Sequence, residues 1–200
     1  MKWIAIFGLL ITVSAASAVE VQEIKPLSGR SEWRDIFRKT EFSNADEMRK
    51  DRRVAVGTQL GGTTGQYGIG VNLFFNPESA FVASFGGSDS YRGFHFGGQF
   101  LWSEKSFSVY HRLGYSRWYN SQKSGSMGSS ELPTSNLLSK NERESGRFSL
   151  NLAVAGLGLQ YSVLKGPYAG TALFVEAIGL TSVRDFSIAT TGSAGLLYHF

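Results

Sequence analysis

Cysteine is absent from the 200 residues of this chain. Without it the chain forms no disulfide bond and has no thiolate to act as nucleophile or metal ligand, so chemistry of that kind is excluded. Beyond residue 18, no apolar run approaches the ~18 residues that a membrane-spanning helix needs. The three histidines, His95, His111 and His199, are too dispersed for a usual metal motif, and the sequence indicates neither a metal nor a cofactor.

Charge of either sign is also sparse. The formal net charge is +4. The sequence has no basic cluster combined with a motif that recognises nucleic acid, which nucleic-acid binding would require. Glycine and aromatic residues are abundant instead, at 24 residues and 14%. Because they occur in short alternating runs, the composition favours β-structure over helices.

The first 18 residues have the three parts of a secretory signal peptide. Lys2 supplies a positive charge, residues 3–13 form an apolar core, and Ala16-Ser17-Ala18 is a small-residue cleavage signature. We therefore expect residues 1–18 to direct export across the inner membrane and to be cleaved before Val19.

Residues 19–52 differ from the rest of the chain because they are charged and lack strand alternation. Trp33, Ile36 and Phe37 are spaced i, i+3, i+4 behind Ser31, a residue type that caps helices, which predicts a short amphipathic helix. Its apolar face would lie either on a membrane surface, since basic residues are close by, or beneath the main domain. We interpret 19–52 as a periplasmic N-terminal segment.

From residue 53 onward the pattern becomes a meander of strands. Large and small or polar residues alternate in eight segments, each near or above the ~9–11 residues with which a tilted strand crosses a bilayer. The segments are 52–62, 66–75, 79–87, 91–102, 106–120, 147–163, 168–180 and 187–200. They predict an all-β domain over 53–200, an eight-stranded antiparallel up-and-down transmembrane β-barrel.

The connections and the strand faces favour a membrane. The second, fourth and sixth connections are short and the fifth, 120–146, is very long, as in barrels with short periplasmic turns and longer outer loops. In several strands the bulky residues share one face and small or polar residues the other, which indicates lipid outside and a narrow interior. Aromatic residues gather at the strand ends predicted to be periplasmic, as an interfacial girdle: Phe75, Phe81, Trp102, Phe107, Tyr161, Tyr168, Tyr198 and Phe200.

Two strands depart from this simple pattern. In the strand over 147–163, the apolar residues up to Val154 and those from Leu157 have opposite parity, which predicts a β-bulge near Gly156. In the strand over 106–120, an inward Arg112 turns His111 toward lipid, and nothing in the pattern explains that exposure.

Inward polar residues are expected at middle depth in the barrel. Arg112 and Glu176 are predicted to pair across the interior and close it, because an unpaired charge there would be costly. The same pair would act as a gate if the barrel were a narrow pore. The predicted cluster comprises Arg112, Glu176, Asn72, His95, Gln99 and Asn151.

The last eight residues, SAGLLYHF, keep the alternation of a strand to the end. Ser193, Gly195, Tyr198 and Phe200 match a pattern that resembles the C-terminal β-signal of Gram-negative outer-membrane proteins. Residues 53–200 are thus similar in architecture to the small eight-stranded barrels typified by OmpX and OmpA. The resemblance implies a location in the cell outer membrane, with outer-membrane lipids, lipopolysaccharide and the barrel-assembly machinery as partners.

Enzymatic activity is not expected. Asp89-Ser90 occupies the place of the Asp-Ser pair of the lipid A palmitoyltransferase family, but no histidine precedes His95 to act as the base. No histidine begins the His-x-Ser motif of the lipid A deacylase family. We expect a structural or surface-interaction role in which loop 120–146 supplies any extracellular contact. The alternatives are a narrow pore for small solutes and, less favoured, a lipid A-modifying enzyme.

Overall fold

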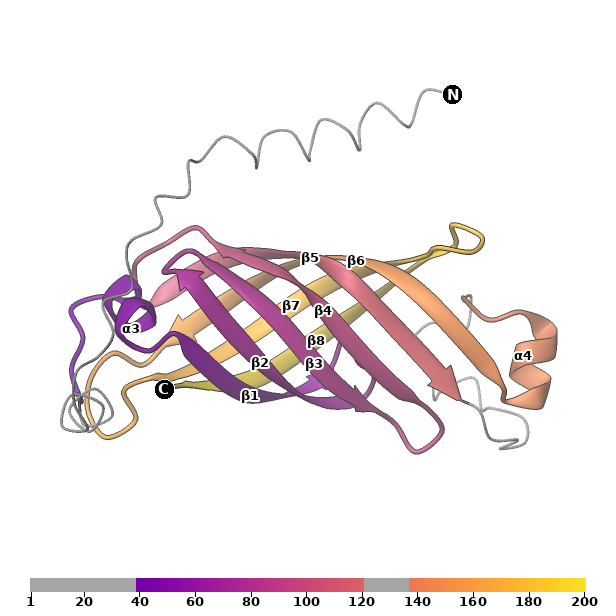
Figure 1. Cartoon of the computed structure of the whole chain (residues 1–200), viewed down its shortest axis with the longest axis horizontal. Helices are drawn as coiled ribbons and strands as arrows, with labels where there is room; N and C mark the ends of the chain where they lie inside the picture. The colour runs from indigo at the N-terminus through magenta and orange to yellow at the C-terminus, as the bar shows by residue number, and fades with distance from the viewer. Residues whose placement is uncertain (1–38, 121–136) are drawn as a thin grey trace, which may run out of the picture. The chain divides into compact units, whose positions relative to one another are not determined.

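The computed structural model describes residues 39–120 and 137–200, in which eight strands form one closed barrel (Figure 1). The predicted signal peptide, the predicted helix around Trp33 and residues 121–136 of the long loop lie outside the described residues. The strands are β1 Val54–Gly61, β2 Tyr67–Asn76, β3 Ser79–Gly87, β4 Arg92–Leu101, β5 Phe107–Asn120, β6 Phe148–Ser162, β7 Thr171–Ser182 and β8 Ile188–His199.

Within the described residues two short helices accompany the strands, α3 Ala45–Asp51 before β1 and α4 Lys140–Ser145 before β6. They lie at opposite ends of the barrel, and the C-terminus lies at the end that carries α3 (Figure 1). No helix in the described part of the chain is long and apolar enough to cross a membrane.

Each strand pairs antiparallel with its neighbours in the sequence, and β1 also pairs with β8. In that closing pair Val56 lies opposite Tyr198 and Gln59 opposite Gly195. Closure removes both edges of the sheet, and eight strands leave an interior just wide enough for side chains to fill. The predicted eight-stranded antiparallel up-and-down barrel is therefore confirmed.

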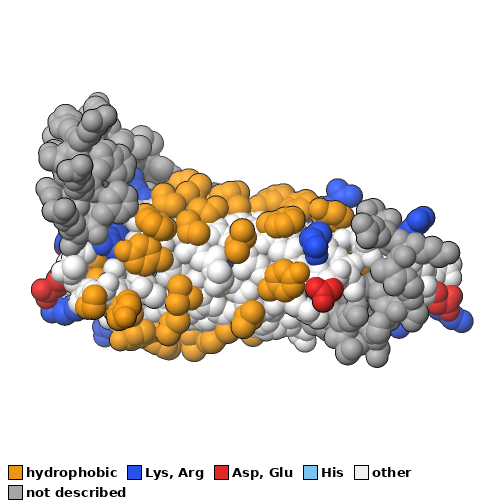
Figure 2. All heavy atoms as spheres, turned by 90° about the horizontal axis from the view of Figure 1, so that it is seen from below, with side chains coloured by type: hydrophobic (Ala, Val, Ile, Leu, Met, Phe, Trp, Pro, Cys, Tyr) orange, Lys and Arg blue, Asp and Glu red, His pale blue; other side chains and the backbone are white. Residues whose placement is uncertain are grey.

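The outer wall of the barrel is apolar. Every strand contributes exposed large side chains to it, from Val56 and Ile69 on one side to Leu159 and Val175 on the other. Figure 2 shows such side chains spread over one face of the wall, with charged side chains gathered toward its two ends. An apolar surface of this extent needs an apolar partner.

Strand β6 alternates without interruption, contrary to the prediction. Its apolar residues up to Val154 are buried inside the barrel, whereas those from Leu157 are exposed outside. Pairing with β5 and β7 continues through Gly156 with no register shift. The predicted β-bulge near Gly156 was wrong, because the apolar residues change face at this height while the strand keeps its register.

The interior of the barrel contains two apolar clusters. The larger lies toward the α4 end and includes side chains from the connections that flank it: Tyr91, Trp118, Leu137, Leu138, Phe148, Leu150, Leu152, Val154, Ile178 and Leu180. The smaller lies toward the α3 end: Ala55, Phe74, Ala80, Leu101, Tyr110, Ala172, Phe174 and Leu197. Together they fill both halves of the barrel and leave a layer at middle depth for polar residues.

Residues 39–53 pack against the end of the barrel where the C-terminus lies. The side chain of Asn44 caps α3 by accepting a hydrogen bond from the backbone N–H of Glu47 at 2.8 Å.

Met48 is fully buried, and Arg52 is 2% exposed. The Arg52 guanidinium donates to the carbonyls of Lys39, Ala169 and His199, at 2.9, 2.8 and 3.3 Å. The guanidinium thus joins the N-terminal segment to the ends of the last strands.

Replacing Arg52 with methionine should therefore destabilise the folded barrel, with Arg53→Met as the matched control because Arg53 is exposed. Hydrogen bonds to a charged group contribute about 1.5–3 kcal/mol each, so a loss of about 3 kcal/mol or more is expected. The measurement is the temperature at which the compact band in unheated detergent gels converts to the unfolded one. Equal midpoints for the two variants would show that Arg52 does not anchor the segment.

Candidate functional site in the barrel interior

A buried ion pair lies at the centre of the polar layer. Arg112 comes from β5 and Glu176 from β7, and both point into the barrel. Their side chains are 4% and 0% exposed, and Arg112 Nη1 lies 3.1 Å from Glu176 Oε1. Because these strands are not adjacent, the pair spans β6 and joins two parts of the wall through the interior.

Further polar side chains form hydrogen bonds to the pair on both sides. Glu176 accepts hydrogen bonds from the Tyr110 hydroxyl at 2.8 Å and from the Ser193 hydroxyl at 3.3 Å. Arg112 Nη2 donates to Gln99 Oε1 at 3.0 Å. Gln99 Oε1 also accepts from Asn72 at 3.3 Å, and Gln99 Nε2 donates to Gln160 at 3.4 Å. The buried charges are thus compensated by each other and by neutral hydrogen bonds.

The structure brings together four of the six predicted interior residues, namely Arg112, Glu176, Gln99 and Asn72. The prediction missed Tyr110 and Gln160, which share the inward parity of Arg112 on β5 and of Gly158 on β6. Parity alone would have found Tyr110, which lies two residues before Arg112 on the same face of β5. Ser193 was predicted only as part of the assembly signal.

His95 and Asn151 do not join the pair. His95 faces the interior, with Nδ1 3.0 Å from the Ser116 hydroxyl oxygen. Asn151 is exposed on the outer wall, where its Oδ1 accepts a hydrogen bond from the Tyr115 hydroxyl at 2.6 Å. The interior assignment of Asn151 was wrong because β6 keeps its register and turns Leu150 and Leu152 inward at this height.

The outward position of His111 has an explanation in its neighbours. Its ring stacks on Phe100 with centroids 4.9 Å apart and an interplanar angle of 18°. The Trp102 ring lies 5.4 Å away on the same wall. His111 is therefore a member of an aromatic cluster, in which the flat face of its ring is covered.

The aromatic residues predicted as a girdle lie at the end of the barrel that carries α3. Six of them are exposed at 37% to 72%: Phe75, Phe81, Trp102, Phe107, Tyr161 and Tyr168. Phe200 is 44% exposed, and its ring meets that of Tyr198 edge-on at 5.0 Å. Among the predicted assembly residues, Gly195 faces inward where an added Cβ would lie 2.5 Å from the Phe174 ring.

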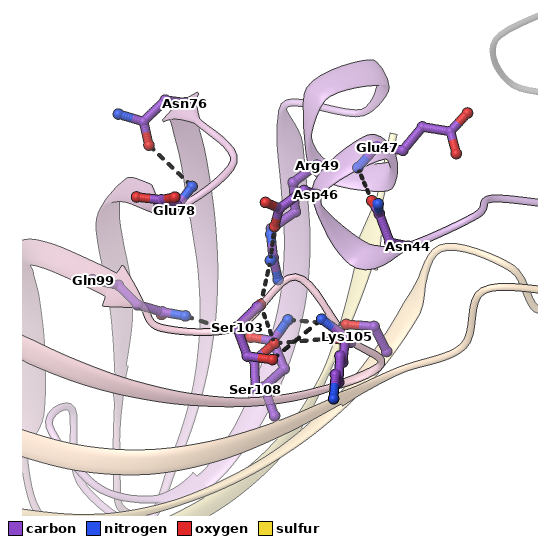
Figure 3. A network of polar contacts seen from close by, with 12 residues as sticks. Asn44, Asp46, Glu47, Arg49, Asn76, Glu78, Gln99, Ser103, Lys105 and Ser108 are labelled. Atoms are coloured by element: carbon purple, nitrogen blue, oxygen red, sulfur yellow. Dashed lines mark hydrogen bonds and ion pairs between the residues drawn. The ribbon is translucent and has the colours of Figure 1, made fainter.

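Both ends of the described interior are occupied by the chain itself. At the α4 end the β1–β2 connection folds inward, and Trp118 Nε1 donates to the carbonyl of the buried Thr63 at 2.7 Å. At the α3 end the buried Arg49 donates to Asp46 at 2.6 Å and to the carbonyl of Ser103 at 3.0 Å (Figure 3). Beside Arg112 the interior leaves a cavity of about 20 Å³.

No group of three or more His, Asp or Glu side chains in 39–120 and 137–200 is placed to hold a metal ion. The polar layer consists of one ion pair, whose opposite charges cancel, and the hydrogen bonds around it. It can brace the barrel from inside, or it can act as a gate if the ion pair breaks.

Removing one partner of the ion pair should cost more than removing both. Arg112→Met leaves a buried carboxylate unpaired, and Glu176→Leu leaves a buried guanidinium unpaired, each at a cost of about 3–5 kcal/mol. The double variant should recover most of that loss, because two apolar side chains of similar volume replace the pair. A thermal-unfolding cycle on the four proteins measures the coupling, and purely additive losses would contradict a direct contact.

No protein-family model matches the sequence, and no curated protein sequence matches it either. Among solved structures, the N-terminal β-barrel domain of Pseudomonas aeruginosa OprF matches with a TM-score of 0.52 and 13% identity, over 73% of this chain and 97% of that one. The attachment invasion locus protein Ail of Yersinia pestis matches with a TM-score of 0.41 and 14% identity, over 74% and 96%. The likeness to OprF shows that this chain has the fold of that closed β-barrel.

Proposed function

We propose that this chain is an outer-membrane β-barrel protein with a non-enzymatic structural or surface-interaction role. The observation that carries the proposal is the contrast between the two faces of one closed sheet. The outer wall carries large apolar side chains on every strand, whereas the interior holds a hydrogen-bonded polar layer between two apolar clusters. A barrel of this kind is stable in lipid.

The orientation of the barrel follows from its ends. The end with α3 and the aromatic girdle faces the periplasm, and the end with α4 and the long loop faces outward. The partners are outer-membrane lipids and lipopolysaccharide around the wall. The barrel-assembly machinery acts during insertion, through the pattern from Ser193 to Phe200.

The described part of loop 120–146 is tied to the barrel and supports a role in surface contact. Ser139 and Glu142 form a reciprocal capping box at the start of α4. Arg184, from the β7–β8 turn, donates to both carboxylate oxygens of Glu142 at 2.7 and 3.1 Å. A bidentate pair of this geometry fixes α4 on the rim. The helix fixed in this way presents a polar surface, and such a surface is a suitable binding place for an extracellular ligand.

Two alternative functions have less support. A pore needs a passage, and the interior cavity of about 20 Å³ holds little more than one water molecule. A lipid A-modifying enzyme needs a base near Asp89-Ser90. The first histidine of the described chain, His95, instead faces inward and contacts Ser116.

The proposal is tested by locating the full-length protein and by measuring ion conductance. Membrane fractionation should recover it with the outer membrane as a heat-modifiable band. Planar bilayers containing the wild-type protein should show no steady conductance, whereas Glu176→Ala, which breaks the buried pair, should either leak or melt earlier. Steady wild-type channels would support the pore instead, and altered lipid A on overexpression would support the enzyme.

The contact that fixes α4 should persist to strongly acidic pH. Hydrogen bonds from Arg184, and then from Ser139, lower the pKa of Glu142 from an ordinary 4.5 to about 2. A lowered pKa means that the contact contributes fully above about pH 4.5 and is lost as the pH falls through 2. NMR titration of the Glu142 carboxyl should give a midpoint near 2, which Arg184→Gln should raise. A midpoint unchanged by that variant would show that Arg184 does not hold the loop.

A further inference from the structure

The outer wall carries very little charge, and what it carries is at one place. Apart from histidine, the eight strands contain four charged residues, and two of these, Arg112 and Glu176, point inward. The other two, Arg92 and Arg117, are exposed on the outer face of the neighbouring strands β4 and β5. In that strand pair Arg92 lies opposite Tyr119 and Phe94 lies opposite Arg117, so the two arginines are diagonal neighbours.

Both guanidinium groups are oriented by neutral partners and not by carboxylates. Arg92 donates to the backbone carbonyls of Ser88 and Tyr91 in the β3–β4 connection. Arg117 donates through Nε to the Ser149 hydroxyl at 3.2 Å. Within the described residues neither arginine forms an ion pair with an acidic side chain. In the part of the chain that the structure describes, the site is therefore a fixed pair of positive charges that forms no ion pair with an acidic side chain.

An apolar groove begins at Arg92 and runs down the outer wall. Its upper part has a volume of about 460 Å³ and is lined by Arg92, Thr58, Leu60, Tyr67, Ile69 and Phe85. A second hollow of about 510 Å³ shares Ile69 and Phe85 with the first and extends to Phe94 and Phe96. The two hollows adjoin at Ile69 and Phe85, and Arg92 lies at the far side of the first. An apolar surface with a cation at one end matches a lipid headgroup above its acyl chain.

We propose that Arg92 and Arg117 bind the phosphate of an anionic lipid whose acyl chain lies in this groove. The inference rests on the proposed function, because the wall must face a bilayer. The planar donors of a guanidinium match phosphate oxygens, and the two guanidiniums match the two negative charges of a phosphate monoester better than the single charge of a diester. The position near the strand ends places the arginines at the level of lipid headgroups, where they are tolerated on a barrel wall.

The test uses the full chain in phosphatidylcholine nanodiscs that contain a small fraction of phosphatidic acid, a phosphate-monoester lipid. Native mass spectrometry measures how much of that lipid stays bound, with phosphatidylglycerol as the diester comparison. The wild-type protein should retain phosphatidic acid over phosphatidylglycerol. R92Q/R117Q should reduce retention at least about fivefold, since each lost charge-assisted contact costs up to about tenfold in affinity.

The matched control is R53Q/K105Q, which removes the same charge from exposed residues at the α3 end of the barrel. If the two double variants lose lipid retention equally, net charge alone explains the effect and the proposed site is overturned. A third variant, T58W, places a larger side chain in the groove and keeps both arginines. This variant should weaken retention of long-chain phosphatidic acid but not of the dihexanoyl form. If it affects both chain lengths equally, the proposal that the acyl chain lies in the groove is overturned.

Inorganic phosphate distinguishes a lipid site from a free-anion site. Millimolar phosphate should not displace the lipid, because the groove contributes to its binding, and full displacement would overturn the proposal. A heat-modifiable band for every variant shows that the barrel is folded. Failure of lipid retention by a folded protein that still fractionates with the outer membrane contradicts this inference alone, whereas loss of that location contradicts the proposed function.

Discussion

The ion pair between Arg112 and Glu176 is the contact on which the interior of the barrel depends. A closed sheet of eight strands leaves too little room for bulk water to solvate a buried charge, so each charge requires the other. The pair also determines its surroundings, because Tyr110, Ser193 and Gln99 complete its hydrogen bonds. Since the partners come from β5 and β7, the contact fixes two parts of the wall that are not paired with each other.

The two apolar clusters on either side follow from the same constraint. Without an apolar cluster on each side, the polar layer would be open to water, and the attraction between Arg112 and Glu176 would weaken. Toward the α4 end the layer is covered by Trp118 and by loop residues such as Leu138. Toward the α3 end Phe74 and Phe174 cover it, and residues 39–53 close the mouth. The barrel is therefore built as three stacked layers inside one sheet.

Strand alternation predicted most of this fold, because a period of two assigns each residue to the wall or to the interior. The assignment failed where both faces of a strand are apolar at different heights. In β6 the inward Leu150 and the outward Leu159 are chemically alike, and the pattern alone cannot distinguish a bulge from an apolar interior. The misplacement of Asn151 followed from that ambiguity. Helix α3 was missed for another reason, since its stability comes from the buried Met48 and from tertiary contacts of Arg49, which sequence spacing does not reveal.

The N-terminal segment and the C-terminal strand depend on each other in a way that no local pattern contains. Arg52 needs the carbonyls of Ala169 and His199 within reach of one guanidinium, and these carbonyls come together only when β7 and β8 are paired. The backbone N–H of Phe200 in turn donates to the carbonyl of Val54 at 2.7 Å, directly after the segment. Residues 39–53 therefore fit the closed barrel and not an open sheet. The contacts that cover the mouth at the α3 end also hold the β1–β8 seam together, which is the part of a closed sheet with the largest separation in sequence.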